Sequence, residues 1–250
     1  MNVVKNEYIK ALIKITPNLN YAQDFRDGKL WMNRLAFFHG LEKKEIGDKN
    51  EGRTLSFQTF TSMINVVDTS SLCMPIFCLY AIYGDDRTDT IIQIPTKMLK
   101  FGQYAVIVKD VDSFLTRIQQ VGLEFSPVYY YPAHPNASDP DFRIPFCPEY
   151  RKLHEFQYQS EFRLVRRRTL LTKDNAEKYD WLSGAEVFDD DHYIARIEGG
   201  LSDITTEILQ AKSLAFPRNR KIRLNTDWNR VRVQDHIKYR NPLLVREKEL

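Results

Sequence analysis

The sequence has few cysteines and no long apolar run. Cys73, Cys78 and Cys147 are its three cysteines, and no two of them have Cys-x-x-Cys spacing. An odd number of scattered cysteines argues against a disulfide framework and against a zinc site. No segment approaches the roughly 20 apolar residues of a membrane-spanning helix. Residues 1–14 also lack the apolar core and cleavage site of a signal peptide. These absences predict a protein of the reducing cytoplasm that has no membrane partner.

Several well-known catalytic motifs are also missing. The sequence contains no His-Glu-x-x-His, Gly-x-Ser-x-Gly, Walker A or Gly-x-Gly-x-x-Gly pattern. Zinc proteases, serine hydrolases, P-loop enzymes and Rossmann dehydrogenases therefore lose their usual support. An acid pair, Asp48 and Glu51, has the chemistry to bind a metal or activate a water, but its loop lacks the ligand spacing of an EF-hand. We predict no metal site.

The sequence does have an ordinary globular composition. Hydrophobic residues make up 43% of the 250 positions and charged residues 28%, which is enough apolar surface to form a packed core. Tyr and Phe are frequent in strand-like alternating runs, and no linker or repeat divides the chain. We expect an α+β fold in which residues 1–250 form a single domain. Its core would be one mixed, mostly antiparallel sheet with flanking helices.

The spacing of apolar residues predicts the individual elements. Residues 3–15 have helical spacing and predict a short amphipathic helix. Residues 30–38 predict a buried strand that runs into a helix, and residues 70–83 a central strand with Pro75 at its start or at a bulge. Further strands are expected at 104–108, 127–131 and 160–166, and a helix at 111–121 capped by Asp110 or Asp112. The five prolines of residues 132–148 predict a loop.

Positive charge is concentrated near the C-terminus. Residues 211–240 contain nine Lys and Arg against two acidic residues, in a chain whose net charge is only +3. Cations interleaved with aromatic rings suit single-stranded RNA, because phosphates meet the cations and bases stack on the rings. An acidic protein partner, such as an antitoxin or a chaperone, would suit the same charge. The candidate nucleic-acid-binding residues are Arg218, Arg220, Lys221, Arg223, Trp228 and Arg230.

The strongest local motif is Gln159-Ser160-Glu161 at the entrance of an expected strand. It resembles the catalytic signature of ADP-ribosyltransferases. The resemblance implies that Glu161 stabilises the positive charge that develops on ribose as nicotinamide leaves NAD, and that Gln159 orients the acceptor. On a strand the two side chains would share one face. The alternative is that Glu161 pairs with Arg163 or Arg166 on a solvated strand face.

The same resemblance extends to earlier positions in the chain. ADP-ribosyltransferases often hold NAD with an Arg on an early strand, which Arg34 matches, and with a Ser-Thr-Ser or a Tyr on a second strand. Ser70, within Thr69-Ser70-Ser71, and Tyr80 are the candidates there, although the sequence has no Ser-Thr-Ser triplet. The resemblance implies a split β-sandwich and NAD as substrate. The alternatives are an Arg34 that pairs with a surface carboxylate, a Ser70 that caps a turn and a Tyr80 that lies in the core.

A second resemblance covers roughly the first two-thirds of the chain. The aromatic segment 30–38, the loop Gly47–Gly52 and the later Glu161-Phe162-Arg163 occur in the same order in an uncharacterised group of bacterial and phage-associated proteins. It implies a toxin of antiphage defence. The leading hypothesis is therefore an ADP-ribosyltransferase-like enzyme that uses NAD to modify a macromolecule such as RNA. A non-enzymatic nucleic-acid or partner-binding protein and a metal-dependent nuclease using Asp48, Glu51 and Glu161 are the alternatives.

Overall fold

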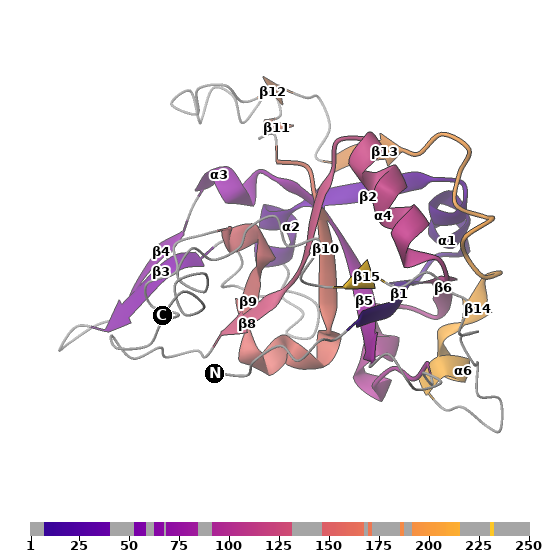
Figure 1. The fold of residues 1–250 in the computed structure, drawn as a ribbon. Coiled ribbons are helices and arrows are strands. Elements are labelled where there is room, and N and C mark those ends of the chain that lie inside the picture. The colour runs from indigo at the N-terminus through magenta and orange to yellow at the C-terminus, as the bar shows by residue number, and fades with distance from the viewer. Residues whose placement is uncertain are drawn as a thin grey trace, which may run out of the picture.

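The computed structural model describes ten stretches of the chain, and they form a mixed α/β structure (Figure 1). These stretches are residues 8–40, 53–58, 63–67, 69–84, 92–131, 147–167, 170–171, 186–187, 192–215 and 231–232. The strands are β1 (Tyr8–Thr16), β2 (Lys29–Arg34), β3 (Arg53–Gln58), β4 (Met63–Val67), β5 (Pro75–Gly84), β6 (Tyr104–Val108), β7 (Glu124–Pro127), β8 (Tyr129–Tyr131), β9 (Arg151–Leu153), β10 (Glu161–Val165), β11 (Leu170–Leu171), β12 (Glu186–Val187), β13 (His192–Arg196), β14 (Leu209–Gln210) and β15 (Val231–Arg232). The helices are α1 (Leu19–Arg26), α2 (Leu35–Gly40), α3 (Thr69–Leu72), α4 (Val111–Gln120) and α6 (Ala211–Ala215), with 3-10 helices η1 (Thr96–Phe101), η3 (Pro148–Tyr150) and η4 (His154–Gln159).

Among the described residues the main sheet has nine strands, and all of their pairings are antiparallel. Its main path runs β13-β2-β5-β1-β6-β14, while β10 pairs with β5 and β7, and β15 pairs with β1. The expectation of a mostly antiparallel sheet with flanking helices is confirmed, and β5 is its central strand as predicted. β5 begins at Pro75, where a residue without a backbone N–H removes no ladder hydrogen bond from the strand interior.

Helices cover both faces of this sheet. On one face, α1 and α4 pack through Phe25, Phe114 and Ile118 against β-strand residues such as Leu12 and Phe77. On the other face, η1 and α6 bring Met98 and Leu214 against Ile13 and its neighbours. Both faces of the strands are therefore buried, so the central strands carry apolar residues at successive positions rather than only at alternate ones.

The helix predicted for residues 3–15 is wrong, because residues 8–16 form β1. Leu12 faces the core beneath α1 and α4, while Ala11 and Ile13 face the opposite core. A strand buried on both faces has no alternation between apolar and polar residues, and its apolar run also satisfies a helical pattern. Residues 8–16 form a strand because they pair with β5 on one edge and with β6 on the other.

The other strong predictions agree with the structure. β2 runs directly into α2, β6 is followed by α4, and Asp110 caps α4 by accepting a hydrogen bond from the Ser113 backbone N–H at 3.0 Å. No helix among the described residues is long and apolar enough to span a membrane. The proline-rich segment 132–148 lies outside the described residues up to residue 146.

An opening in the sheet lies along one edge of β5. On the opposite edge, β10 pairs with β5 from Ile76 to Tyr80 without interruption. On the open edge, β2 pairs only at Pro75 and Ile76, and β1 begins to pair only at Tyr80. Residues 77–79 of β5 thus face a space where β1 and β2 diverge. We call this space the β1/β2 gap.

Candidate functional site

A cavity of about 130 Å³ occupies the β1/β2 gap. Residues of β1, β2, β5, η1 and β10 contribute to its lining. Side chains from both faces of the sheet take part, so the cavity lies between the diverging strands rather than on one face. The charged residues that line it are Lys14, Lys152, Glu161 and Arg163, and Trp31, Asn33, Tyr80 and Gln159 line it as well.

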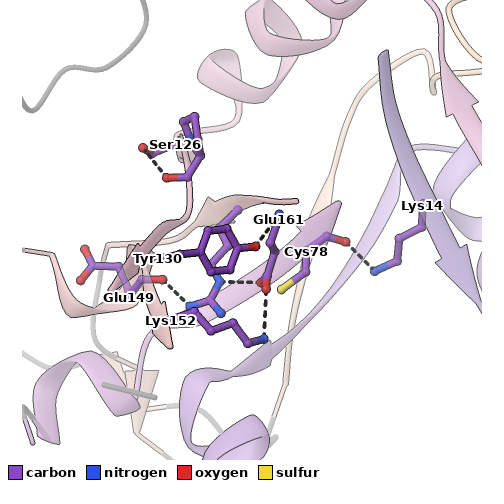
Figure 2. Close-up of polar contacts among 9 residues, drawn as sticks. Lys14, Cys78, Ser126, Tyr130, Glu149, Lys152 and Glu161 are labelled. Atoms are coloured by element: carbon purple, nitrogen blue, oxygen red, sulfur yellow. Dashed lines mark hydrogen bonds and ion pairs between the residues drawn. The ribbon is translucent and has the colours of Figure 1, made fainter. Parts of the chain in front are cut away.

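Glu161 is the centre of a buried polar network in this cavity (Figure 2). Its Oε1 accepts a hydrogen bond from Arg163 Nε at 2.6 Å, and its Oε2 accepts one from Lys152 Nζ at 3.1 Å. Cys78, which pairs with Arg163 across β5 and β10, lines the same cavity. All three charged side chains are at least nine-tenths buried. The two cations therefore fix the position of the buried Glu161 carboxylate.

The network favours the ionised form of Glu161. Burial alone would raise its pKa, but the charges of Arg163 and Lys152 outweigh burial and hold the pKa well below the ordinary value of 4.5. Burial and the nearby Glu161 charge raise the pKa of Cys78, so this residue stays a neutral thiol. Glu161 is therefore an ionised carboxylate at neutral pH, although it is buried and only 5% exposed.

Because the pKa of Glu161 is lower in the folded protein than in the unfolded chain, the protein is expected to lose stability in acid. This contribution is fully present above the unfolded pKa, near 4.5, and is lost as the pH falls from there toward the folded pKa. The free energy of unfolding measured from pH 7 to pH 3 checks this, with the Glu161→Gln variant as control. The wild type should fall more steeply below pH 4.5 than the variant, and parallel profiles would contradict the prediction.

The backbone around Glu161 is held by a second layer of contacts. The Glu161 N–H donates to the Tyr130 hydroxyl at 2.8 Å, and Arg163 Nη1 donates to the Glu149 carbonyl at 2.6 Å. Lys152 comes from β9, which pairs in parallel with β8, the strand of Tyr130. Segments distant in sequence therefore converge on a single carboxylate.

The solvated strand face considered for Glu161 is a wrong expectation. All five residues of β10 are buried, because β5 and β7 cover both of its edges and the core covers its faces. The pairing of Glu161 with Arg163 is present, whereas Arg166 donates to the Tyr193 hydroxyl instead. The pairing of Glu161 with Arg163 could thus be predicted from their spacing on one strand face, but the burial of the pair could not.

Gln159 does not lie on the strand, contrary to the expectation. It ends η4, and Ser160 follows in a left-handed conformation with φ of 41°. The rule that residues two apart on a strand share one face therefore does not apply to Gln159 and Glu161. Both residues nevertheless line the cavity, and Gln159 is 3% exposed.

The three residues expected to bind NAD lie in different places. Tyr80 pairs directly with Glu161 across β5 and β10 and lines the cavity, and burial raises its pKa. Arg34 is buried at the end of β2 opposite Pro75. Tyr80 lies five positions along β5 from Pro75, roughly 16 Å, and Arg34 is not among the lining residues. Ser70 lies in α3, which spans Thr69–Leu72.

Lys14 is a cavity residue that the sequence analysis missed. Its Nζ donates to the Cys78 carbonyl at 3.2 Å and lies 3.8 Å from the centre of the Phe77 ring. Burial lowers the pKa of Lys14, and the negative charge of Glu161 acts in the opposite direction. The signal was a lysine inside the apolar run of residues 8–16, which the helix prediction treated as a polar helix face.

The remaining candidates cannot be placed. Asp48 and Glu51 lie outside the described residues, as do all six candidate nucleic-acid-binding residues, Arg218, Arg220, Lys221, Arg223, Trp228 and Arg230. Within the basic segment 211–240 the structure describes only α6 and β15. In the described part of the chain, no three His, Cys, Asp or Glu side chains gather as a metal site would require.

Comparison with protein-family models, curated proteins and solved structures finds no match to this chain. The resemblances stated from the sequence motifs therefore stay predictions. What the chain does has to be argued from the cavity itself.

Proposed function

We propose that the protein is an ADP-ribosyltransferase-like enzyme of the split β-sandwich type, which binds NAD at the cavity in the β1/β2 gap. Glu161 would be its catalytic residue. The observation that carries the proposal is a buried, ionised carboxylate that lines a cavity together with Tyr80 and Gln159. A macromolecule such as RNA would be the acceptor, consistent with a toxin of antiphage defence.

The charge of Glu161 supports this chemistry. Positive charge develops on the ribose as nicotinamide leaves, and a fixed carboxylate stabilises that charge most effectively in a site that excludes water. Arg163 and Lys152 keep Glu161 ionised where burial alone would favour its neutral form. For the carboxylate to contact the ribose, at least one of its two oxygens has to exchange a cation for the substrate.

The cations of the cavity support binding of the NAD diphosphate. Lys14, Lys152 and Arg163 line the same space, where Glu161 is the one carboxylate among the described lining residues. In the proposed complex these three residues hold NAD. The sequence resemblance gave that role to Arg34, which does not line the cavity. Tyr80 and Gln159 would contact the sugar or the departing ring.

The size of the cavity limits which part of NAD enters it. At about 130 Å³ it is comparable with cavities that admit a single benzene ring, on the order of 150 Å³. The nicotinamide end of NAD matches that size, and the rest of the molecule would lie outward along the gap.

The test is nicotinamide release from NAD by the purified protein, with and without total RNA. Glu161→Gln is expected to lower turnover by on the order of 10²-fold, the effect of removing one charge-stabilising group from an active site. Glu149→Gln is the matched control, because Glu149 is 1% exposed, pairs with Arg167 and is not a lining residue. Both variants are assayed below their unfolding temperatures. Equal turnover by Glu161→Gln and the wild type would overturn the assignment.

A non-enzymatic role is the second candidate, and the excess of cations in the cavity favours it. In that case NAD or RNA binds but is not consumed, and affinity for RNA falls steeply with salt through counterion release. Binding without nicotinamide release under any condition would favour this candidate over the enzyme. A nuclease metal at Glu161 is disfavoured, because Lys152 and Arg163 already occupy its oxygens.

A further inference from the structure

Three aromatic side chains form an exposed surface beside the cavity. Trp31 of β2 stacks on His192 of β13, with ring centres 4.7 Å apart and an angle of 28° between the ring planes. The Tyr21 ring of α1 lies 6.1 Å from the Trp31 ring at an angle of 43°. We call Tyr21, Trp31 and His192 the Trp31 ring surface. Because Trp31 also lines the cavity, the ring surface and the cavity adjoin.

The Trp31 ring is both exposed and held in position. Its Nε1 donates to Asp24 Oδ2 at 3.1 Å, and Asp24 Oδ1 accepts from Lys29 Nζ at 3.2 Å. Trp31 is nevertheless 38% exposed and Tyr21 49%. Single exposed aromatic residues are common, whereas adjoining exposed rings are typical of a binding surface. A ring that is already fixed loses little conformational freedom when a ligand stacks on it.

The charges of the adjoining cavity indicate which flat ligand fits. Lys14, Lys152 and Arg163 line the cavity, and Glu161 is the one carboxylate among its described lining residues. Lysine and arginine suit a phosphate, and an exposed indole suits the flat face of a nucleobase. A nucleotide carries both groups in one molecule. A sugar without a phosphate would leave the cations unmatched, and a phosphate without a base would not contact the rings.

We propose that the Trp31 ring surface stacks a nucleobase whose phosphate lies toward the cavity. The adenosine half of NAD and a nucleotide of single-stranded RNA share this chemistry. The inference deepens the proposed function, and its link to NAD rests on that function. The stacking itself requires neither Glu161 nor NAD cleavage, so binding measured alone tests it.

The experiment measures the affinity of the purified protein for AMP by equilibrium dialysis. Trp31→Leu is expected to weaken AMP binding about tenfold, within the range for loss of one base–ring stack. Trp31→Phe, which keeps a smaller ring, should weaken it less. Tyr129→Leu is the matched control and should bind AMP as the wild type does, because Tyr129 is 47% exposed and is not a lining residue. Circular dichroism establishes that each variant is folded.

Ribose 5-phosphate, which lacks the base, separates stacking from damage to the cavity. Its affinity should be the same for the wild type and for Trp31→Leu. An equal loss of affinity for AMP and for ribose 5-phosphate would overturn the proposal, because Trp31 would then only shape the cavity. Unchanged AMP affinity in Trp31→Leu, or no binding of AMP by the wild type at millimolar concentration, would also overturn it.

Competition against labelled AMP distinguishes the two sources of the base. More effective displacement by NAD identifies the adenosine half of NAD, and more effective displacement by a short single-stranded oligoadenylate identifies RNA. Displacement by neither would overturn the proposal. A protein that binds AMP through Trp31 but releases no nicotinamide would refute only the proposed NAD reaction, so the two failures are distinct.

Discussion

Replacement of Glu161 by Gln is expected to lower the free energy of unfolding by about 3–5 kcal/mol, the usual effect of removing one partner from a buried ion pair. The single amide oxygen of Gln replaces only one of the two carboxylate oxygens that accept from Arg163 and Lys152, its NH2 group faces the other donor, and Gln no longer balances their charges. Both cations are at least nine-tenths buried, so water cannot solvate them without opening the site. Urea denaturation of the wild type and the variant measures the difference.

The matched control is the exposed pair of Arg117 and Asp203. Asp203→Asn removes a bidentate ion pair whose carboxylate is 58% exposed, and it should cost roughly 1 kcal/mol or less. Adding Lys152→Met to Glu161→Gln should recover part of the loss, because it removes one of the unbalanced charges. A cost for Glu161→Gln no larger than that for Asp203→Asn would show that water enters the cavity freely.

This prediction affects how activity measurements are interpreted. A destabilised Glu161→Gln variant loses activity through unfolding as well as through chemistry, and the two causes have to be separated. Glu149→Gln removes a buried carboxylate beside Arg167 without touching the cavity. Only a loss of NAD turnover specific to Glu161→Gln, in protein shown to be folded, supports a catalytic role.

Gly102→Ala is expected to destabilise the protein by about 3 kcal/mol, at the upper end of the usual cost of overpacking. A Cβ at this position would lie 2.0 Å from the Thr16 carbonyl carbon and 2.2 Å from its oxygen. The clashing atoms belong to the backbone of β1 and cannot rotate away. Met98 and Phe101 of η1, just before Gly102, line the cavity, so the same change should also weaken ligand binding there.

Gly122→Ala separates this clash from backbone strain. Gly122 has a positive φ of 73°, but a Cβ there meets no atom within 4 Å, so its expected cost is about 1 kcal/mol. Thermal or urea unfolding of both variants provides the comparison. Similar costs for the two would mean that the β1–η1 contact adjusts easily and that Gly102 is not needed for close packing.

The sequence alone was sufficient to predict those helices and strands for which apolar spacing and capping or breaking residues indicate the same element. The strand of residues 104–108 and the helix after it could be predicted because an apolar run is followed by an Asp cap and helical spacing. Pro75 marked the start of the central strand, since proline fits there and not within a ladder. The mostly antiparallel sheet followed from alternating, aromatic-rich segments.

Tertiary structure decided what local patterns left ambiguous. Residues 8–16 are a strand because β5 and β6 pair with both of their edges, although their apolar spacing alone fits a helix. Gln159 leaves the strand because Ser160 adopts a left-handed conformation, which no two-residue periodicity reveals. Propensity is a weak guide wherever long-range pairing supplies most of the stabilisation.

For the site, the sequence determined that Glu161 and Arg163 share one strand face, two residues apart, and that Glu161 is the carboxylate to examine. Only the tertiary structure brought Lys14, from a strand near the N-terminus, and Lys152, from β9, to the same cavity as Glu161. It also placed Arg34 at the other end of β5. The reason is physical: spacing along one strand fixes which neighbours share a face, whereas the divergence of β1 and β2 depends on pairings between segments more than 40 residues apart.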